Sequence, residues 1–234
     1  MVKLVKLISP FALLATLAAL GSPAVSADLP RKPVYKAPPI EYLWNPWQIR
    51  VRALGVITRN SGHVDQVASS GLATSDTIVP ELDISYFFNK NIAAELILGV
   101  TRNHVTGTGS INGLDVGKAW LLPPTLTLQY HFTDFGAFKP YVGAGVNYTW
   151  FFDQSAGNSL NNGVIITNSH LHNAFAPAVQ FGFDYMIDQH WGWNVDAKKL
   201  WLRPSWDGVA GSTPITGKVN LDPWLLGTGI TYKF

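Results

Sequence analysis

The sequence predicts an all-β protein, an eight-stranded antiparallel transmembrane β-barrel with long extracellular loops and short periplasmic turns. Eight segments of about ten residues alternate bulky apolar residues with small or polar ones, which is the period of a strand whose two faces differ. The connections between these segments alternate between long and short. Charged residues make up only 14% of the chain, against roughly 25% in typical soluble domains.

The first 27 residues have the features of a secretory signal peptide. Lys3 and Lys6 precede an apolar run, and Val25-Ser26-Ala27 forms a small-residue cleavage site. The apolar run is too short and wrongly flanked to be a spanning helix. We expect cleavage after Ala27, with cleavage after Ala24 as the alternative, and therefore export from the cytoplasm.

The composition of the mature chain narrows the function classes. Removing the two lysines of the signal peptide from 17 Lys and Arg leaves 15, equal to the 15 Asp and Glu. A neutral chain lacks the basic surface that a nucleic-acid partner requires, so none is expected. The chain contains no cysteine, which excludes disulfides and thiolate metal sites. No later segment has the roughly 20 apolar residues of a transmembrane helix.

A proline-rich leader separates the signal peptide from the barrel. Five prolines fall between residues 28 and 46, and proline cannot donate a backbone hydrogen bond to a helix or to a central strand. We therefore interpret residues 28–45 as an extended periplasmic leader and residues 46–234 as the barrel.

The expected strands follow from the alternation, in chain order. They cover about 46–57, 79–88, 94–101, 125–132, 142–150, 175–185, 191–198 and 224–234. The long connections are polar and rich in Gly, Ser, Asn and Thr, and they cover 58–78, 102–121, 153–172 and 203–218. The short ones cover 89–91, 133–139 and 187–190. This arrangement is typical of a barrel in a bacterial outer membrane, with its long loops outside the cell.

The polarity of the two strand faces favours a membrane barrel over a soluble one. Bulky aliphatic and aromatic residues occupy one face, whereas Arg, Glu, Asp, Gln, Asn, Thr and Gly occupy the other. A soluble periplasmic carrier needs its apolar face inside, so this alternative is disfavoured. Outer-membrane lipid is the expected partner of the apolar face. Aromatic residues at strand ends form the expected interface girdles: Trp47, Phe88, Phe132, Trp150, Tyr185, Trp191, Trp224 and Tyr232.

The last strand ends on an aromatic residue. Trp224, Leu226, Ile230, Tyr232 and Phe234 share one face. A terminal Phe234 with apolar residues two and four positions earlier resembles the signal by which the barrel-assembly machinery recognises outer-membrane barrels, so this machinery is an expected partner.

Five stretches of the chain resemble one family. The stretches are SYFFNKNIAAELILGVT (85–101), KAWLLPPTLTLQYHF (118–132), KPYVGAGVNYTWFF (139–152), FGFDYMIDQHWGWNVDAKKLWLRP (181–204) and LDPWLLGTGITYKF (221–234). They look like the OmpW family of small outer-membrane proteins, and the proline-rich leader is not part of that pattern. The resemblance implies an eight-stranded barrel that admits small hydrophobic molecules, with an alkane-uptake branch within the family. It also implies roles of some members in stress responses and bacteriocin reception.

The inward-facing residues predict a lumen that is polar below and apolar above. Opposite charges in so narrow a lumen should pair, because an unpaired buried charge is costly. The expected polar plug is Arg50, Arg52, Glu95, His131, Asp184, Asp196 and Lys198. The expected ligand path through the apolar upper lumen is Leu54, Val56, Ile97, Phe151 and Leu225.

A closed floor requires another exit for a ligand. Leu122, Pro123 and Pro124 lie at the outer end of the fourth strand, and proline removes donors from a strand ladder. We hypothesise a lateral portal here that releases apolar molecules into the bilayer. The alternative is that these prolines only cap a strand beside a loop.

Other signals are weak, so no metal, cofactor or catalytic site is expected. His170 and His172 could share a face and bind a metal, but no acidic or Cys partner is evident nearby. The stretch GLDVGKA (113–119) is one residue short of a phosphate loop and lacks its Ser or Thr. His131 and Glu95 would need a nucleophile such as Ser85 within reach of the base.

Two functions therefore remain. The first is passive admission of small hydrophobic molecules through the upper lumen, with lateral release. The alternative is a structural or surface-receptor barrel whose extracellular loops bind bacteriocin, phage or host.

Overall fold

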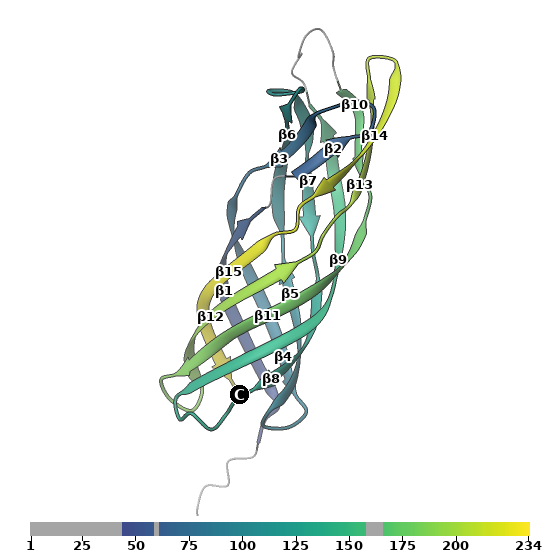
Figure 1. Ribbon diagram of the computed structural model, residues 1–234. Helices are drawn as coiled ribbons and strands as arrows, with labels where there is room; N and C mark the ends of the chain where they lie inside the picture. Colours follow the sequence, from purple (N-terminus) through teal and green to yellow (C-terminus); the bar gives the residue numbers. More distant parts are fainter. Residues whose placement is uncertain (1–43, 59–60, 158–165) are drawn as a thin grey trace, which may run out of the picture. The chain divides into compact units, whose positions relative to one another are not determined.

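A computed structural model describes residues 44–58, 61–157 and 166–234, in which eight antiparallel strands close into a barrel (Figure 1). Around the barrel they run in the order β15, β1, β4, β5, β8, β9, β11 and β12. Pairing of β12 with β15 closes the ring. Their bounds are β1 (Trp47–Ile57), β4 (Thr77–Phe87), β5 (Ile92–Gly99), β8 (Thr125–His131), β9 (Phe138–Ala156), β11 (Ala174–Met186), β12 (Trp191–Leu200) and β15 (Trp224–Lys233). The predicted fold class is confirmed.

The strand faces have the predicted polarity. Outward-facing Val51, Leu128 and Val146 are exposed, whereas Arg50 and Arg52 on the opposite face of β1 are buried. Aromatic rings at the strand ends contact one another on the outside of the barrel: Trp47 and Tyr86 lie edge to face at 5.0 Å, and Trp191 and Tyr232 at 4.7 Å. The C-terminus lies at the end of the barrel that carries the short turns (Figure 1).

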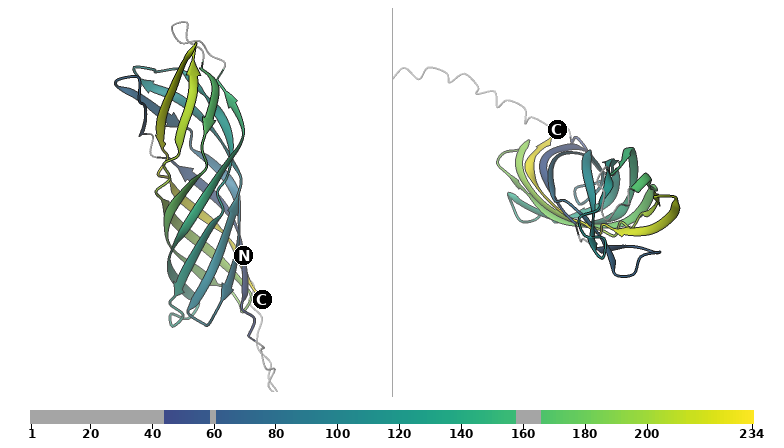
Figure 2. Two further views of the ribbon diagram at one scale, coloured as in Figure 1. Left: turned by 90° about the vertical axis from the view of Figure 1, so that its right-hand side faces the viewer. Right: turned by 90° about the horizontal axis from the view of Figure 1, so that it is seen from above.

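The long connections differ from the prediction, because most of their described residues form strands. Figures 1 and 2 show these strands beyond one end of the barrel. They are β2 (Ser61–Val64), β3 (Ser70–Thr74), β6 (Thr101–Gly109), β7 (Asp115–Leu122), β10 (Ile166–Leu171), β13 (Ser205–Ala210) and β14 (Thr213–Asn220). We call these seven strands, with the upper part of β9, the extension. In it β3, β6, β7 and β9 form one sheet, and β10, β13, β14 and β2 form another.

The extension forms because apolar and polar residues also alternate along its strands, although polar residues predominate in its sequence. Its inward-facing side chains are apolar and pack together: Val64, Leu72, Val105, Val116, Ile166, Leu171, Trp206, Ile215 and Val219. Its outer face carries polar residues such as Lys218 and Thr216. Around the barrel itself the outer face is apolar. The polarity of the outer surface therefore reverses where the barrel passes into the extension.

The predicted signal peptide (1–27) lies outside the described residues, as does the leader (28–45) except for its last two residues. Within the described ranges, no helix is long and apolar enough to span a membrane.

Candidate functional site

The lower lumen is closed by buried charges that we call the polar floor. It comprises three cations and five carboxylates, each at most 3% exposed: Arg50, Arg52, Lys198, Glu81, Asp83, Glu95, Asp184 and Asp196. Arg50 on β1 forms a bidentate ion pair with Asp184 on β11, with Nε–Oδ1 at 3.0 Å and Nη2–Oδ2 at 2.6 Å. It also forms an ion pair with Glu95 on β5. Arg50 therefore links β1 to β5 and β11, neither of which is its neighbour in the barrel.

A second set of ion pairs lies one step higher on β1. Arg52 Nε lies 2.9 Å from Glu81 Oε1, and its guanidinium also pairs with Asp83 and Asp196. Lys198 Nζ lies 2.8 Å from the same Glu81 oxygen and 2.9 Å from Asp196 Oδ1. Each cation meets at least two carboxylates, as charges withdrawn from water require.

Neutral groups connect the two sets of ion pairs. Gln180 Nε2 donates to Glu95 Oε2 at 2.8 Å and to Asp196 Oδ2 at 2.9 Å. The Tyr141 hydroxyl donates to the same Asp196 oxygen at 2.8 Å. The side chains thus fill the lower lumen, as is usual in an eight-stranded barrel.

The structure brings all seven residues of the predicted plug into this region, and adds members that the sequence reasoning left out of the plug. Glu81 and Asp83 have the parity of Ser85 on the polar face of β4, so the alternation alone could have included them. Tyr141 is 1% exposed. Its parity places it inside, but its aromatic ring gave no polar signal.

A catalytic site here would need a hydrogen bond between Ser85 and His131, and the described residues form none. Ser85 Oγ accepts from Arg50 Nη1 at 3.1 Å and donates to Glu95 Oε1 at 3.3 Å. His131 Nε2 instead lies 2.9 Å from Gln129 Oε1, and its ring packs between Phe87 and Tyr141. Serine and histidine are therefore engaged separately within the polar floor.

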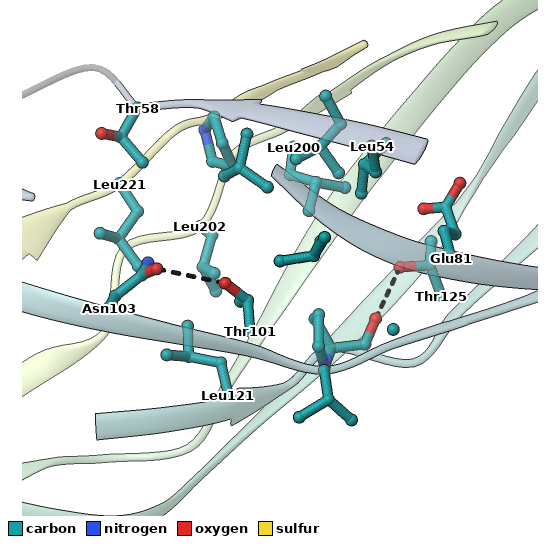
Figure 3. A pocket seen from close by; sticks show the side chains of 17 residues that line it. Leu54, Thr58, Glu81, Thr101, Asn103, Leu121, Thr125, Leu200, Leu202 and Leu221 are labelled. Carbon is teal, nitrogen blue, oxygen red and sulfur yellow. Dashed lines mark hydrogen bonds between the residues drawn. The ribbon is translucent and has the colours of Figure 1, made fainter. Parts of the chain in front are cut away.

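An apolar cavity of about 60 Å³, which we call the chamber, lies above the polar floor (Figure 3). Leu54, Val56 and Leu225 from the predicted ligand path line it. The predicted Ile97 and Phe151 are buried, at 3% and 4% exposure, but are not among its lining residues.

Three further leucines complete the chamber and were not predicted. Leu200, Leu202 and Leu221 line it and are 2–5% exposed. Leu202 and Leu221 fall between strands, where alternation makes no prediction. The apolar character of WLRP (201–204) and LDP (221–223), beside polar loops, is the signal that could have found them.

The chamber reaches the barrel wall at an interruption between two strand ladders. The β5–β8 ladder ends at the pair Ile97–Thr125, and the β6–β7 ladder begins at Thr101–Leu121. Between them, Pro123 and Pro124 have no N–H to donate. We call residues 98–100 and 122–124 the seam. Gly99, Val100 and Pro123 line the chamber, and Val100 is 45% exposed.

A second apolar cavity of about 270 Å³ lies within the extension. It is lined by residues from both sheets of the extension, among them Val64, Ile111, Leu114, Trp206 and Ile215. The indole N–H of Trp206 donates to Ser169 Oγ at 2.8 Å, which fixes the ring against the cavity. Apolar lining therefore continues above the chamber.

Of the two histidines weighed as metal ligands, His170 lies on β10 and His172 directly follows it. Their rings are 4.9 Å apart, and His172 Nε2 lies 2.5 Å from Asp207 Oδ1. In the part of the chain that the structure describes, no three His, Cys, Asp or Glu residues are placed to hold one ion.

Comparison with known proteins places this geometry in a family. The OmpW family profile matches residues 47–234. The uncharacterized outer-membrane protein y4mB of Sinorhizobium fredii is 52% identical, over 90% of each chain. The dibenzothiophene metabolism operon protein PahQ of Pseudomonas aeruginosa is 29% identical, over 81% of this chain and 89% of its own.

A solved structure agrees with the sequence relatives. The outer membrane protein OprG from Pseudomonas aeruginosa superposes with a TM-score of 0.71 and 25% identity, covering 80% of this chain and 95% of OprG. The family match spans the whole barrel, and both y4mB and OprG are named as outer-membrane proteins. This chain belongs to the OmpW family of outer-membrane β-barrel proteins.

Proposed function

We propose that the protein admits small hydrophobic molecules through the chamber and releases them sideways, through the seam, into the outer membrane. One observation carries the proposal: the apolar chamber ends below on the polar floor but extends to the barrel wall at Gly99, Val100 and Pro123. An apolar molecule in the chamber has a route to lipid that crosses no charged group.

The polar floor makes a straight passage to the periplasm unfavourable. A molecule crossing it would separate Arg50 and Arg52 from their buried carboxylates, and breaking such pairs is costly. The seam offers less resistance, because proline leaves the two strands without a continuous backbone ladder.

The ligand class follows from the lining and from one relative. Leucine, valine and proline side chains favour apolar ligands. PahQ is named for an operon of dibenzothiophene metabolism, and dibenzothiophene is a compact apolar molecule. The cavity in the extension provides an apolar station above the chamber.

The first test measures uptake of graded hydrophobic probes by liposomes that contain the barrel. Leu54→Asp places a charge in the chamber, and we expect loss of uptake with retained folding and insertion. Thr213→Asp, at the exposed outer tip of the extension, is the matched control and should behave like wild type. Equal uptake by both variants would instead favour a surface-receptor barrel.

Lateral release has its own test. Val100 and Leu122 lie opposite each other if the register of the two flanking ladders continues across the seam, so a Val100→Cys, Leu122→Cys pair allows a reversible cross-link. Oxidation should stop uptake and reduction should restore it. A pair at Ile84 and Leu96, opposite each other on β4 and β5, is the control. Unchanged uptake after complete oxidation at the seam would exclude this route.

We further propose that Phe234 serves as the assembly signal and that the chain is cut after Ala27. Phe234 is 47% exposed, and its ring packs edge to face on Tyr232 at 4.9 Å. Phe234→Ala should lower the amount of folded barrel in the outer membrane without changing the stability of barrels refolded in vitro. Mass spectrometry of the mature N-terminus tests the cleavage.

A further inference from the structure

Asn147 occupies the boundary between the polar floor and the chamber. It lies on β9 opposite Thr125, in the last pair of the β8–β9 ladder. Its side chain faces the lumen and the residue is 0% exposed. A buried amide must find hydrogen-bond partners, and the ones it finds here are informative.

The amide of Asn147 points at the two prolines of the seam. Its Nδ2 lies 3.0 Å from the Pro123 carbonyl oxygen, 3.3 Å from that of Pro124 and 2.8 Å from Thr125 Oγ1. Its Oδ1 accepts from Thr149 Oγ1 at 2.7 Å. Donor and acceptor are thus both engaged, and the donor is directed at backbone.

The Pro123 carbonyl is held by side chains. A strand carbonyl ordinarily accepts from the N–H of a neighbouring strand. Pro124 does so, since its oxygen accepts from Tyr148 N–H of β9 at 3.0 Å. The Pro123 oxygen accepts instead from Asn147 and, at 3.2 Å, from the hydroxyl of Thr125, a bond drawn in Figure 3.

We propose that Asn147 is a positioning residue that keeps the seam open. By holding the Pro123 carbonyl toward the lumen, its amide keeps that oxygen from accepting an N–H of residues 98–100 on the facing strand. This inference rests on the proposed lateral release and specifies what controls it. Asn147 acts through the backbone of the prolines and is not among the residues that line the chamber.

The test variants keep the size of the side chain and remove its donors. Asn147→Leu has no hydrogen-bonding group, and Asn147→Asp keeps the shape but offers only acceptors to the carbonyls. Thr149→Val is the matched control, because it removes the bond to Oδ1 and leaves the Asn147 donors in place. If the leucine variant fails to fold, the aspartate variant carries the test.

Two readouts are measured on folded barrels in lipid: amide hydrogen exchange at Gly99 and Val100, and uptake of the hydrophobic probes. Freed from Asn147, the Pro123 carbonyl turns to the facing strand, so exchange at one of these amides should slow by about tenfold, the effect of one hydrogen bond. Uptake should fall in both donor-less variants, and Thr149→Val should remain close to wild type.

The outcomes separate this inference from the function on which it rests. Unchanged exchange and uptake in a folded Asn147→Leu barrel would overturn the positioning role, and so would faster uptake, because Asn147 would then hold the seam shut. A loss of stability with unchanged exchange would show a merely structural amide. If oxidation of the cysteine pair at the seam leaves wild-type-level uptake, lateral release fails, whereas the exchange measurement still reports on Asn147.

Discussion

The polar floor and the chamber are built from the same barrel strands by opposite chemistry. On β1, Arg50 and Arg52 belong to the floor. The next two inward-facing residues, Leu54 and Val56, line the chamber. The floor is closed because each of its cations reaches two or more carboxylates across the lumen. The chamber retains a void because the leucine and valine side chains that line it do not fill the space between them. Ion pairs thus close the lower lumen, whereas the apolar side chains above them leave a cavity.

The largest expected effect is on the stability of the floor. Arg50→Ala leaves Glu95 and Asp184 buried without their cation, which should cost about 3–5 kcal/mol of unfolding free energy. Urea unfolding from lipid vesicles, followed by tryptophan fluorescence, measures it. His63→Ala, which removes a contact with Asp65 between two exposed side chains, is the control and should have little effect. Similar losses for the two variants would contradict the sealing role of the floor.

The chamber should tolerate truncation better. Leu54→Ala removes a buried side chain beside an existing cavity, so we expect a cost of about 2–3 kcal/mol. Uptake should persist, since the change enlarges the chamber without adding charge. Loss of uptake here, in a folded barrel, would contradict the assignment of the chamber as a route.

The single hydroxyl of Tyr141 sharpens the comparison within the floor. Tyr141→Phe removes the donor to Asp196, which keeps its contacts with Lys198, Arg52 and Gln180. The expected cost is about 1 kcal/mol in the same unfolding measurement. A cost as large as that of Arg50→Ala would show that hydrogen bonds, and not charges, hold the floor together.

The smallest effect is expected at the turn below the floor. Hydrogen bonds from the backbone N–H groups of Trp191 and His190 lower the pKa of Asp188 from its ordinary value. Its contribution to stability is therefore present above the ordinary Asp pKa of about 4 and is lost as the pH falls through the lowered value. Asp188→Ala should be slightly less stable than wild type at neutral pH and equal to it in strong acid. A difference that grows on acidification would have the wrong sign.

Alternation predicted the barrel well because lipid-facing and lumen-facing residues differ so strongly in polarity. It placed Arg50, Glu95 and Leu54 inside, where the structure has them. It did not reveal the extension, where small and polar residues such as Thr and Gly are interspersed with single apolar ones. It also placed Asn147 on the polar inward face but did not reveal its role, because that role depends on which carbonyls the fold brings beside the amide.

The strands of the extension are held in register by ladders of backbone hydrogen bonds. This determines where the protein could carry an inserted foreign peptide. Deleting any one of these strands would unpair its neighbours and create new sticky edges. The turns that join β6 to β7 and β13 to β14 can be lengthened without unpairing a strand. Their Gly113 and Gly211, at φ of +83° and +64°, have open space around them. Peptides inserted at these two tips would be displayed above the cell surface while the ion-paired floor, at the other end of the barrel, stays undisturbed.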